Sequence, residues 1–418
     1  MLKKVIKYSG SIILTLMFAI IMIIGYYGSV LPETFNVLED DNLFLNIFPF
    51  SVCVSSKVSP TNLNISENRS IQNCKTNYPA KLKLLNILPI KTVQVNVIPK
   101  RSVIPCGTPF GVKIYTQGVM IIEISDVVTN KGLYSPAKIS GLQKGDIITK
   151  INNKNIYSNE DLEEILQNSQ GENINLSITR NEENFETSLK PLKSCDDDKY
   201  RAGIWVRDSS AGIGTLTFVD PTTQTFAGLG HGICDVDTGK MLPVAKGEIV
   251  KASISSVKKG HIGFPGELKG HFINSNSIGT LYDNNNIGLY GKIKDFDNTM
   301  ESVDIGMKQH VKKGPAQIIT TLDGTEPCSY DINIDSINYN INCPTKNIKI
   351  TVTDPILIEK TGGIVQGMSG SPIIQNGMLV GAVTHVFINN PLKGYAIFAE
   401  TMLTNSNRLF DGEYKKEA

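Results

Sequence analysis

Residues 367–372 read Gly-Met-Ser-Gly-Ser-Pro, and this string is the sharpest signal for chemistry in the chain. A serine hydroxyl in a tight, glycine-rich turn can point outward while nearby backbone N–H groups face a developing oxyanion. The spacing favours Ser369 as the nucleophile, with Ser371 as the alternative. The amides of Gly367 and Ser369 are the predicted donors to the oxyanion. The string therefore predicts acyl transfer through a serine.

A serine hydroxyl is a weak nucleophile without a base, and the chain has five histidines to supply one. His231 lies between two glycines, which let the backbone come close to a partner or a substrate. His385 lies on a predicted strand after the serine and is the alternative base. The remaining histidines have the surroundings of surface residues: His261, His271 and His310.

The third member of such a site is a buried carboxylate that orients the imidazole and stabilises its charged form. Four aspartates have suitable surroundings: Asp220, Asp235, Asp304 and Asp354. Asp354 ends an alternating strand shortly before the serine string, and Asp304 is its main rival. The residues alone leave the choice between these two open.

Residues 200–418 must position these side chains, and they contain no long, strongly periodic helical segment. Short apolar runs punctuated by glycine predict many short strands in a sandwich or barrel. The string around Ser369 resembles the Gly-x-Ser-Gly-Gly-Pro nucleophile loop of trypsin-like serine proteases, with Ser371 in place of the second glycine of the pair. This resemblance implies a trypsin-like double β-barrel and a mainly β chain.

Residues 103–192 form a predicted α+β unit of their own, with strands at 112–115, 119–124 and 173–180 and a helix at 158–170. The unit resembles a PDZ domain of the bacterial protease-associated type. The resemblance rests on Ser135-Pro136-Ala137, Gly141-Leu142, Gly145-Asp146-Ile147-Ile148 and Ile151-Asn152. Such domains bind peptide tails by strand addition. We predict the binding edge at Phe110, Gly111 and Val112; the alternative is a spacer that binds no free peptide.

The N-terminal residues carry a membrane signal. Lys3, Lys4 and Lys7 precede an uncharged apolar run at residues 12–27, which with its flanks approaches the length of a membrane-spanning helix. We therefore predict a single-pass membrane protein with an uncleaved transmembrane helix; the alternative is a cleaved signal peptide. Both interpretations put the catalytic domain outside the cytoplasm. The predicted division is an anchor at 1–29, a linker and short β region at 30–102, the PDZ-like domain at 103–192 and the peptidase domain at 193–418.

Charge and cysteine content narrow the classes of function. The 41 basic and 40 acidic residues give a formal net charge of +1, and no basic stripe is interleaved with aromatics, so nucleic-acid binding is not expected. The seven cysteines form no C-x-x-C pair, so we expect no metal site and no cofactor. Cys328 and Cys343 could close a short loop in an oxidising compartment; the alternative is free thiols.

Taken together, these features resemble one family, the SpoIVB peptidases of endospore-forming bacteria. The matching text lies at residues 87–104, in the PDZ-like segment, in the Ala-Gly-Leu-Gly-His-Gly string that ends at Gly232, and at residues 361–373 and 380–386. The resemblance covers nearly the whole chain, apart from an Asn-rich segment at residues 55–77 that has no counterpart. That segment is interpreted as an insertion in an irregular stretch, residues 30–80. The sequence does not show where self-cleavage occurs, and this stretch is the natural place to look for it.

The resemblance implies a serine endopeptidase that cleaves itself and then a membrane-bound regulatory protein, leading to processing of the mother-cell sigma factor. It implies a triad of His231, Asp354 and Ser369, with Thr384 supporting activity. It also implies a place in the forespore membrane, facing the intermembrane space. The non-enzymatic alternative is a PDZ tether or adaptor that regulates another protease.

Overall fold

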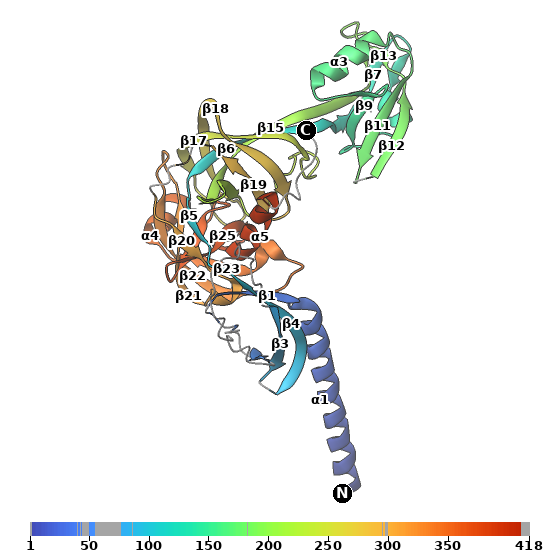
Figure 1. The fold of residues 1–418 in the computed structure, drawn as a ribbon. Helices are drawn as coiled ribbons and strands as arrows, with labels where there is room; N and C mark the ends of the chain where they lie inside the picture. The colour runs from blue at the N-terminus through green and yellow to red at the C-terminus, as the bar shows by residue number, and fades with distance from the viewer. Residues whose placement is uncertain are drawn as a thin grey trace, which may run out of the picture.

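The computed structural model describes residues 2–39, 41, 43, 50–54, 77–85, 87–181, 183–294, 296 and 300–410. Within these ranges the chain is mainly β. Figure 1 shows two packed barrels in the middle, a small sheet with a long helix at one end, and a separate compact unit at the other. The two barrels matter most here because the candidate catalytic residues lie between them.

The N-terminal part pairs a long helix with a small sheet. Its elements are α1 (Leu2–Val30), β1 (Thr34–Leu38), β2 (Phe50–Val54), β3 (Asn77–Leu84) and β4 (Leu88–Ile98), with the sheet order β1-β4-β3-β2. The short β region predicted within residues 30–102 corresponds to this sheet, in which β4 is the longest strand. Phe35, Val37, Leu82 and Val95 are buried in the same apolar cluster as residues of one barrel, so the sheet packs on that barrel. The predicted insertion at residues 55–77 lies almost wholly outside the described residues.

The structure contradicts the predicted transmembrane helix. Among the described residues, no helix combines the length and the hydropathy that crossing a membrane requires. The fold class was therefore wrong in its transmembrane helix, and the single-pass membrane localisation that followed from it was wrong as well.

The first barrel is a ring of six antiparallel strands. They are β6 (Pro109–Ile124), β15 (Ile204–Asp220), β16 (Thr225–Gly228), β17 (Val244–Lys258), β18 (Glu267–Asn285) and β19 (Gly288–Ile293). Pairings run β6-β15-β16-β19-β18-β17 and back to β6, which closes the ring. Phe110, Val112, Leu216 and Phe226 fill its interior.

The second barrel closes in the same way. Its strands are β21 (Gly314–Thr320), β22 (Cys328–Ile337), β23 (Ile348–Val352), β24 (Pro372–Gln375), β25 (Met378–Phe387) and β26 (Asn390–Phe398). The ring runs β21-β22-β23-β26-β25-β24 and back to β21. β23 shows why these residues form a strand: Ile348, Ile350 and Val352 alternate inward and are fully buried, with polar residues between them.

Short elements join the barrels. β5 (Ser102–Pro105) pairs with β15 of the first barrel and with β20 (Val303–Ile305), which in turn pairs with β25 of the second. The helices are η1 (Lys308–His310), η2 (Pro344–Lys346), α4 (Pro355–Thr361) and α5 (Ala399–Phe410). The sequence did not predict α5, which buries Met402 and Leu403 and bonds Ser406 to Thr225 of β16.

The unit at the far end holds the PDZ-like elements. These are β7 (Val127–Thr129), β8 (Gly132–Tyr134), α2 (Pro136–Ile139), β9 (Ile147–Ile151), β10 (Lys154–Asn155), α3 (Asn159–Asn168), β11 (Ile174–Arg180), β12 (Glu183–Leu189), β13 (Leu192–Lys193) and β14 (Tyr200–Arg201). The predicted helix is confirmed as α3, where Ser158 and Asp161 form a capping box. β6 and β15 continue from the first barrel into this unit as a paired ribbon (Figure 1). The predicted division assigns β5 and the first half of β6 to the PDZ-like domain. In the structure β5 pairs with strands that join the two barrels, and the first half of β6 is part of the first barrel.

Candidate active site

The loop that carries Ser369 follows α4 and is fastened to the first barrel by β15. The Thr215 hydroxyl donates to the Gly367 carbonyl at 2.7 Å, and the Thr215 N–H donates to the Ser369 carbonyl at 3.3 Å. The Thr217 hydroxyl donates to the Gly370 carbonyl at 2.7 Å. Three hydrogen bonds from one strand thus fix the carbonyls of Gly367, Ser369 and Gly370 and anchor the loop to β15.

Gly370 is the position where the loop admits no side chain. Its φ is +95°, and a Cβ there would lie 2.2 Å from the Thr215 carbonyl oxygen and 2.6 Å from the Leu229 nitrogen. The Gly-x-Ser-Gly pattern in the sequence therefore has a steric cause, which is the close packing of the loop on β15 and on the His231 loop.

Two backbone donors of the nucleophile loop have no hydrogen-bond partner among the described residues. In the part of the chain that the structure describes, the N–H groups of Gly367 and Ser369 donate no hydrogen bond, whereas those of Met368, Gly370 and Ser371 are all engaged. A pair of free N–H groups beside a half-exposed serine is the arrangement that binds an oxyanion. Both are the donors that the sequence predicted.

His231 lies on a tight loop that follows β16. Leu229 and Gly230 both have positive φ, +64° and +70°. This conformation is strained for leucine, and such strain gathers at functional sites. The Nδ1 atom of His231 lies 2.9 Å from the Gly232 carbonyl oxygen. A carbonyl only accepts, so this contact assigns the proton to Nδ1 and leaves the Nε2 lone pair available to take a proton.

Ser369 and His231 line one cleft of about 610 Å³ between the barrels, together with Thr384 and His385. The Ser369 hydroxyl lies 2.6 Å from the Leu229 carbonyl oxygen and 3.1 Å from that of Thr384. Among the described residues, no hydrogen bond joins Ser369 to His231. Catalytic hydrogen bonds are often loose without substrate, and a rotation about χ1 of the serine would release its hydroxyl.

His385, the alternative base, lies beside His231 with ring centroids 5.4 Å apart. Desolvation, together with the neighbouring His231 and Lys346, lowers the pKa of His385 to about 4. A base with so low a pKa holds few protons at neutral pH and accepts them poorly. Thr384, predicted to support activity, is buried and donates from its hydroxyl to the Thr345 carbonyl at 2.6 Å.

The structure does not bring the predicted aspartates to the imidazole. Asp354 caps α4: its carboxylate accepts from the Leu357 N–H at 2.9 Å and from the Asp331 N–H at 3.3 Å. Asp304 accepts from Ser102 on β5. Neither lines the cleft, and neither does any other carboxylate of the described residues. Ser371, the alternative nucleophile, is completely buried, and its hydroxyl has no hydrogen-bond partner.

Phe110, Gly111 and Val112 are not at a free edge, contrary to the predicted peptide-binding site. They lie in the first barrel, where β6 pairs with β15 on one side and β17 on the other. Because both edges are occupied, no peptide strand can be added there. In the sequence these residues precede the PDZ-like elements directly, but the chain reaches that unit only at the far end of β6.

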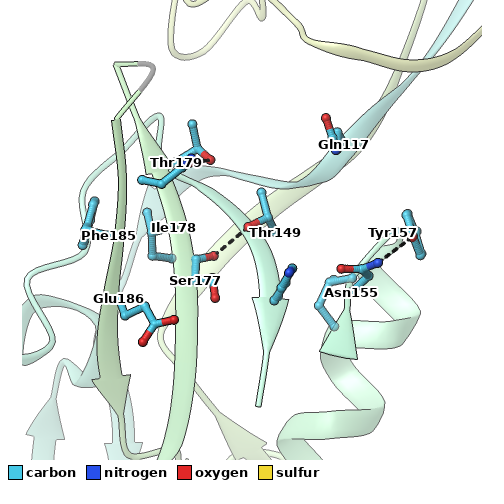
Figure 2. Close-up of a pocket in the computed structure, with 12 residues that line it drawn as sticks. Gln117, Thr149, Asn155, Tyr157, Ser177, Ile178, Thr179, Phe185 and Glu186 are labelled. Atoms are coloured by element: carbon cyan, nitrogen blue, oxygen red, sulfur yellow. Dashed lines mark hydrogen bonds between the residues drawn. The ribbon is translucent and has the colours of Figure 1, made fainter. Parts of the chain in front are cut away.

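The PDZ-like unit offers two other hollows. One, of about 560 Å³, lies between α3 and the start of β15, with Leu162 and Leu166 on the helix side and Gly203, Ile204 and Trp205 on the strand side. Residues 204–206 pair with β6 on one edge, and among the described residues nothing pairs with the other. The second hollow, of about 570 Å³, lies over β9, β11 and β12 (Figure 2). There Thr149 bonds to the Ser177 carbonyl and Asn155 to Tyr157, so much of its polar lining is already paired.

Cysteines and metal ligands add no further chemistry to the described residues. Cys328 and Cys343 are both free and exposed, so they do not close the loop proposed for them. Burial raises the pKa of the Cys106 thiol well above its usual value, which keeps it protonated. No three His, Cys, Asp or Glu side chains gather as a metal site within the described ranges.

Two protein-family models match this chain. The family model for the SpoIVB peptidase S55 matches residues 198–403, and the model for the PDZ domain matches residues 128–180. No curated protein sequence matches the chain.

Two solved structures illustrate partial likeness. The PDZ domain of the SdrC-like protein from Listeria monocytogenes is 19% identical, covers 22% of this chain and 90% of its own, and has a TM-score of 0.18. The HtrA-type protease AlgW with decapeptide is 13% identical, covers 49% of this chain and 55% of its own, and has a TM-score of 0.30. The serine, the histidine and both free amides lie inside the region matched by the peptidase model, and the chain is a SpoIVB-like serine peptidase that carries a PDZ domain.

Proposed function

We propose that Ser369 is the nucleophile, that His231 is the general base, and that the amides of Gly367 and Ser369 hold the oxyanion. The observation that carries this assignment is the pair of unengaged N–H groups beside a half-exposed serine, in the same cleft as an imidazole with a free Nε2. Ser371 is a poor rival because it is buried.

The reaction is acyl transfer to water. Ser369 Oγ attacks the peptide carbonyl carbon, its proton passes to His231 Nε2, and the negative charge on the carbonyl oxygen is stabilised by the two amides. The C–N bond then breaks, and His231 returns the proton to the leaving amine. Water, deprotonated by the same imidazole, releases the acyl group. Before the attack Ser369 must give up its bond to the Leu229 carbonyl, which costs about 1 kcal/mol.

The proposed role is that of a serine endopeptidase in sporulation signalling. It cleaves itself and a membrane-bound regulatory protein, and so leads to processing of the mother-cell sigma factor. The match of residues 198–403 to the SpoIVB peptidase model supports this role. The PDZ domain supports recognition of protein tails, and we place that recognition in the groove between α3 and β15.

The test uses the full chain, a fluorophosphonate probe and mapping of the label by mass spectrometry. We expect label on Ser369, strongly slowed in His231→Ala and absent in Ser369→Ala, because the alcohol reacts only when a base activates it. Peptide hydrolysis should fall by at least about 10⁴-fold in Ser369→Ala. Ser371→Ala is the matched control and should still be labelled. Label on Ser371, or none on a folded sample, would overturn the assignment.

A further inference from the structure

We propose that the cleft around Ser369 selects peptides with uncharged, aliphatic side chains next to the scissile bond. The inference rests on the proposed function and names its substrate class. The evidence for it is the set of side chains that line the cleft, apart from the reacting residues Ser369 and His231.

The walls of the cleft are aliphatic and uncharged. Among the described residues that line it there is no Asp, Glu, Lys or Arg. The apolar part of the wall comes from both barrels: Ile213, Val236, Ile364, Val365, Val386 and Ile388. Lys346 helps to lower the pKa of His385, but its ammonium lies over the Tyr395 ring and it does not line the cleft.

Two of these side chains are held in solvent. Val236 is 87% exposed and Ile388 is 56% exposed. A substrate side chain that covers them removes apolar surface from water, which is favourable by about 25 cal/mol per Å². A charged side chain in the same place would lose hydration without finding a counter-ion, which is strongly unfavourable. The wall therefore favours aliphatic substrate side chains and disfavours charged ones.

The backbone beside the serine suits an extended substrate. β24 pairs with β25 only as far as Ala382, and beyond it residues 385–387 pair with β26 alone among the described strands. His385 and Val386 line the cleft, so this part of β25 borders it and has one edge that no described strand pairs with. A peptide added there in extended form alternates its side chains, so that every second one faces the aliphatic wall.

The experiment digests a synthetic peptide library with the full-chain protein and identifies the cleaved bonds by mass spectrometry, with Ser369→Ala as the blank. We expect Val, Ile or Leu beside the scissile bond to exceed Lys, Arg, Asp or Glu by at least about tenfold in kcat/KM. Cleavage next to charged residues would overturn this inference and leave the proposed function standing. Absence of any cleavage above the blank would overturn both.

A charge placed on the wall tests the same assignment from the protein side. Ile388→Glu should raise cleavage of Lys-containing peptides relative to Leu-containing ones several-fold, because the new carboxylate supplies the missing counter-ion. Ile262→Glu is the matched control, since Ile262 is 74% exposed but does not line the cleft. An unchanged profile in Ile388→Glu, or the same change in the control, would count against the proposed wall.

Discussion

The imidazole of His231 and the carboxylate of Asp354 have separate partners in this structure. His231 donates from Nδ1 to a backbone carbonyl, and Asp354 accepts from two backbone N–H groups at the start of α4. A carbonyl can fix the tautomer and the ring orientation as a carboxylate does, although it supplies no negative charge. The helix capped by Asp354 ends at Gly362, where the nucleophile loop begins.

Substitutions at Asp354 separate a capping role from a place in the triad. Asparagine caps a helix about as well as aspartate, so Asp354→Asn should keep peptidase activity within about tenfold, whereas Asp354→Ala should lose about 1 kcal/mol of stability. Activity assays and thermal melts of both variants measure this. A loss near 10⁴-fold in Asp354→Asn with unchanged stability would instead place the carboxylate in the triad.

His385 makes stability depend on pH. Its folded-state pKa of about 4 lies below the ordinary value of 6.5. The unfolded chain therefore binds the proton first, and this contribution to stability is full above pH 6.5 and is lost as pH falls toward 4. Thermal melts of His385→Asn should lose less stability than wild type between pH 7 and 5, by an amount limited by the exposure of the side chain. His261→Asn, at an exposed histidine, is the control; parallel curves for wild type and His385→Asn would contradict the assignment.

At the scale of elements, β15 links the parts of the molecule. Its first residues border the groove of the PDZ unit, Arg207 reaches the loop that follows His231, and Thr215 holds the nucleophile loop. Arg207 bonds to Asp235, whose side chain is fully buried, and to Asp237 at 2.8 Å. Burial opposes ionisation of Asp235, but hydrogen bonds from Thr238 and Arg207 outweigh it and hold the pKa of this carboxyl below its usual value.

Arg207→Ala leaves that carboxylate buried without its cation. We expect a loss of about 3 kcal/mol in the free energy of unfolding, measured by urea denaturation, and slower peptide hydrolysis because the His231 loop loses its anchor. Arg201→Ala removes a solvent-exposed pair with Asp197 and should change stability by less than about 1 kcal/mol. Equal losses of stability in the two variants would show that the buried Arg207–Asp235 pair contributes no more than the exposed Arg201–Asp197 pair.

At the scale of the whole molecule, the PDZ unit stands at the end of the β6 and β15 ribbon, away from the cleft (Figure 1). Its groove contains Trp205, which is 62% exposed and is the sole tryptophan of the sequence. Tryptophan emission therefore reports on this groove alone.

A peptide with a C-terminal aliphatic residue should shift the Trp205 emission to the blue as it covers the indole. Leu162→Ala, on the α3 wall, should weaken binding by about tenfold because it removes apolar contact from the groove. Tyr157→Ala changes the other hollow (Figure 2) and should leave binding unchanged. An emission shift that responds to Tyr157 and not to Leu162 would move the peptide site to that second hollow.

The sequence by itself determined the features that depend on neighbouring residues. The Ser158 cap of α3 is local, because a cap needs only residues a few positions apart. The nucleophile string and the glycines around His231 are recognisable in the sequence, although the atoms that exclude a side chain at Gly370, Gly230 and Gly232 come from distant segments. The choice of partner for His231 and the place of the peptide groove were decided only by tertiary structure. The groove uses β15 and α3, which are separated in the sequence by β11 to β14. Asp354 precedes the serine string by only 13 residues, but in space it caps the start of α4. The apolar run of α1 also misled: its composition suggested a membrane segment, but among the described residues no helix is both long and apolar enough to cross a membrane.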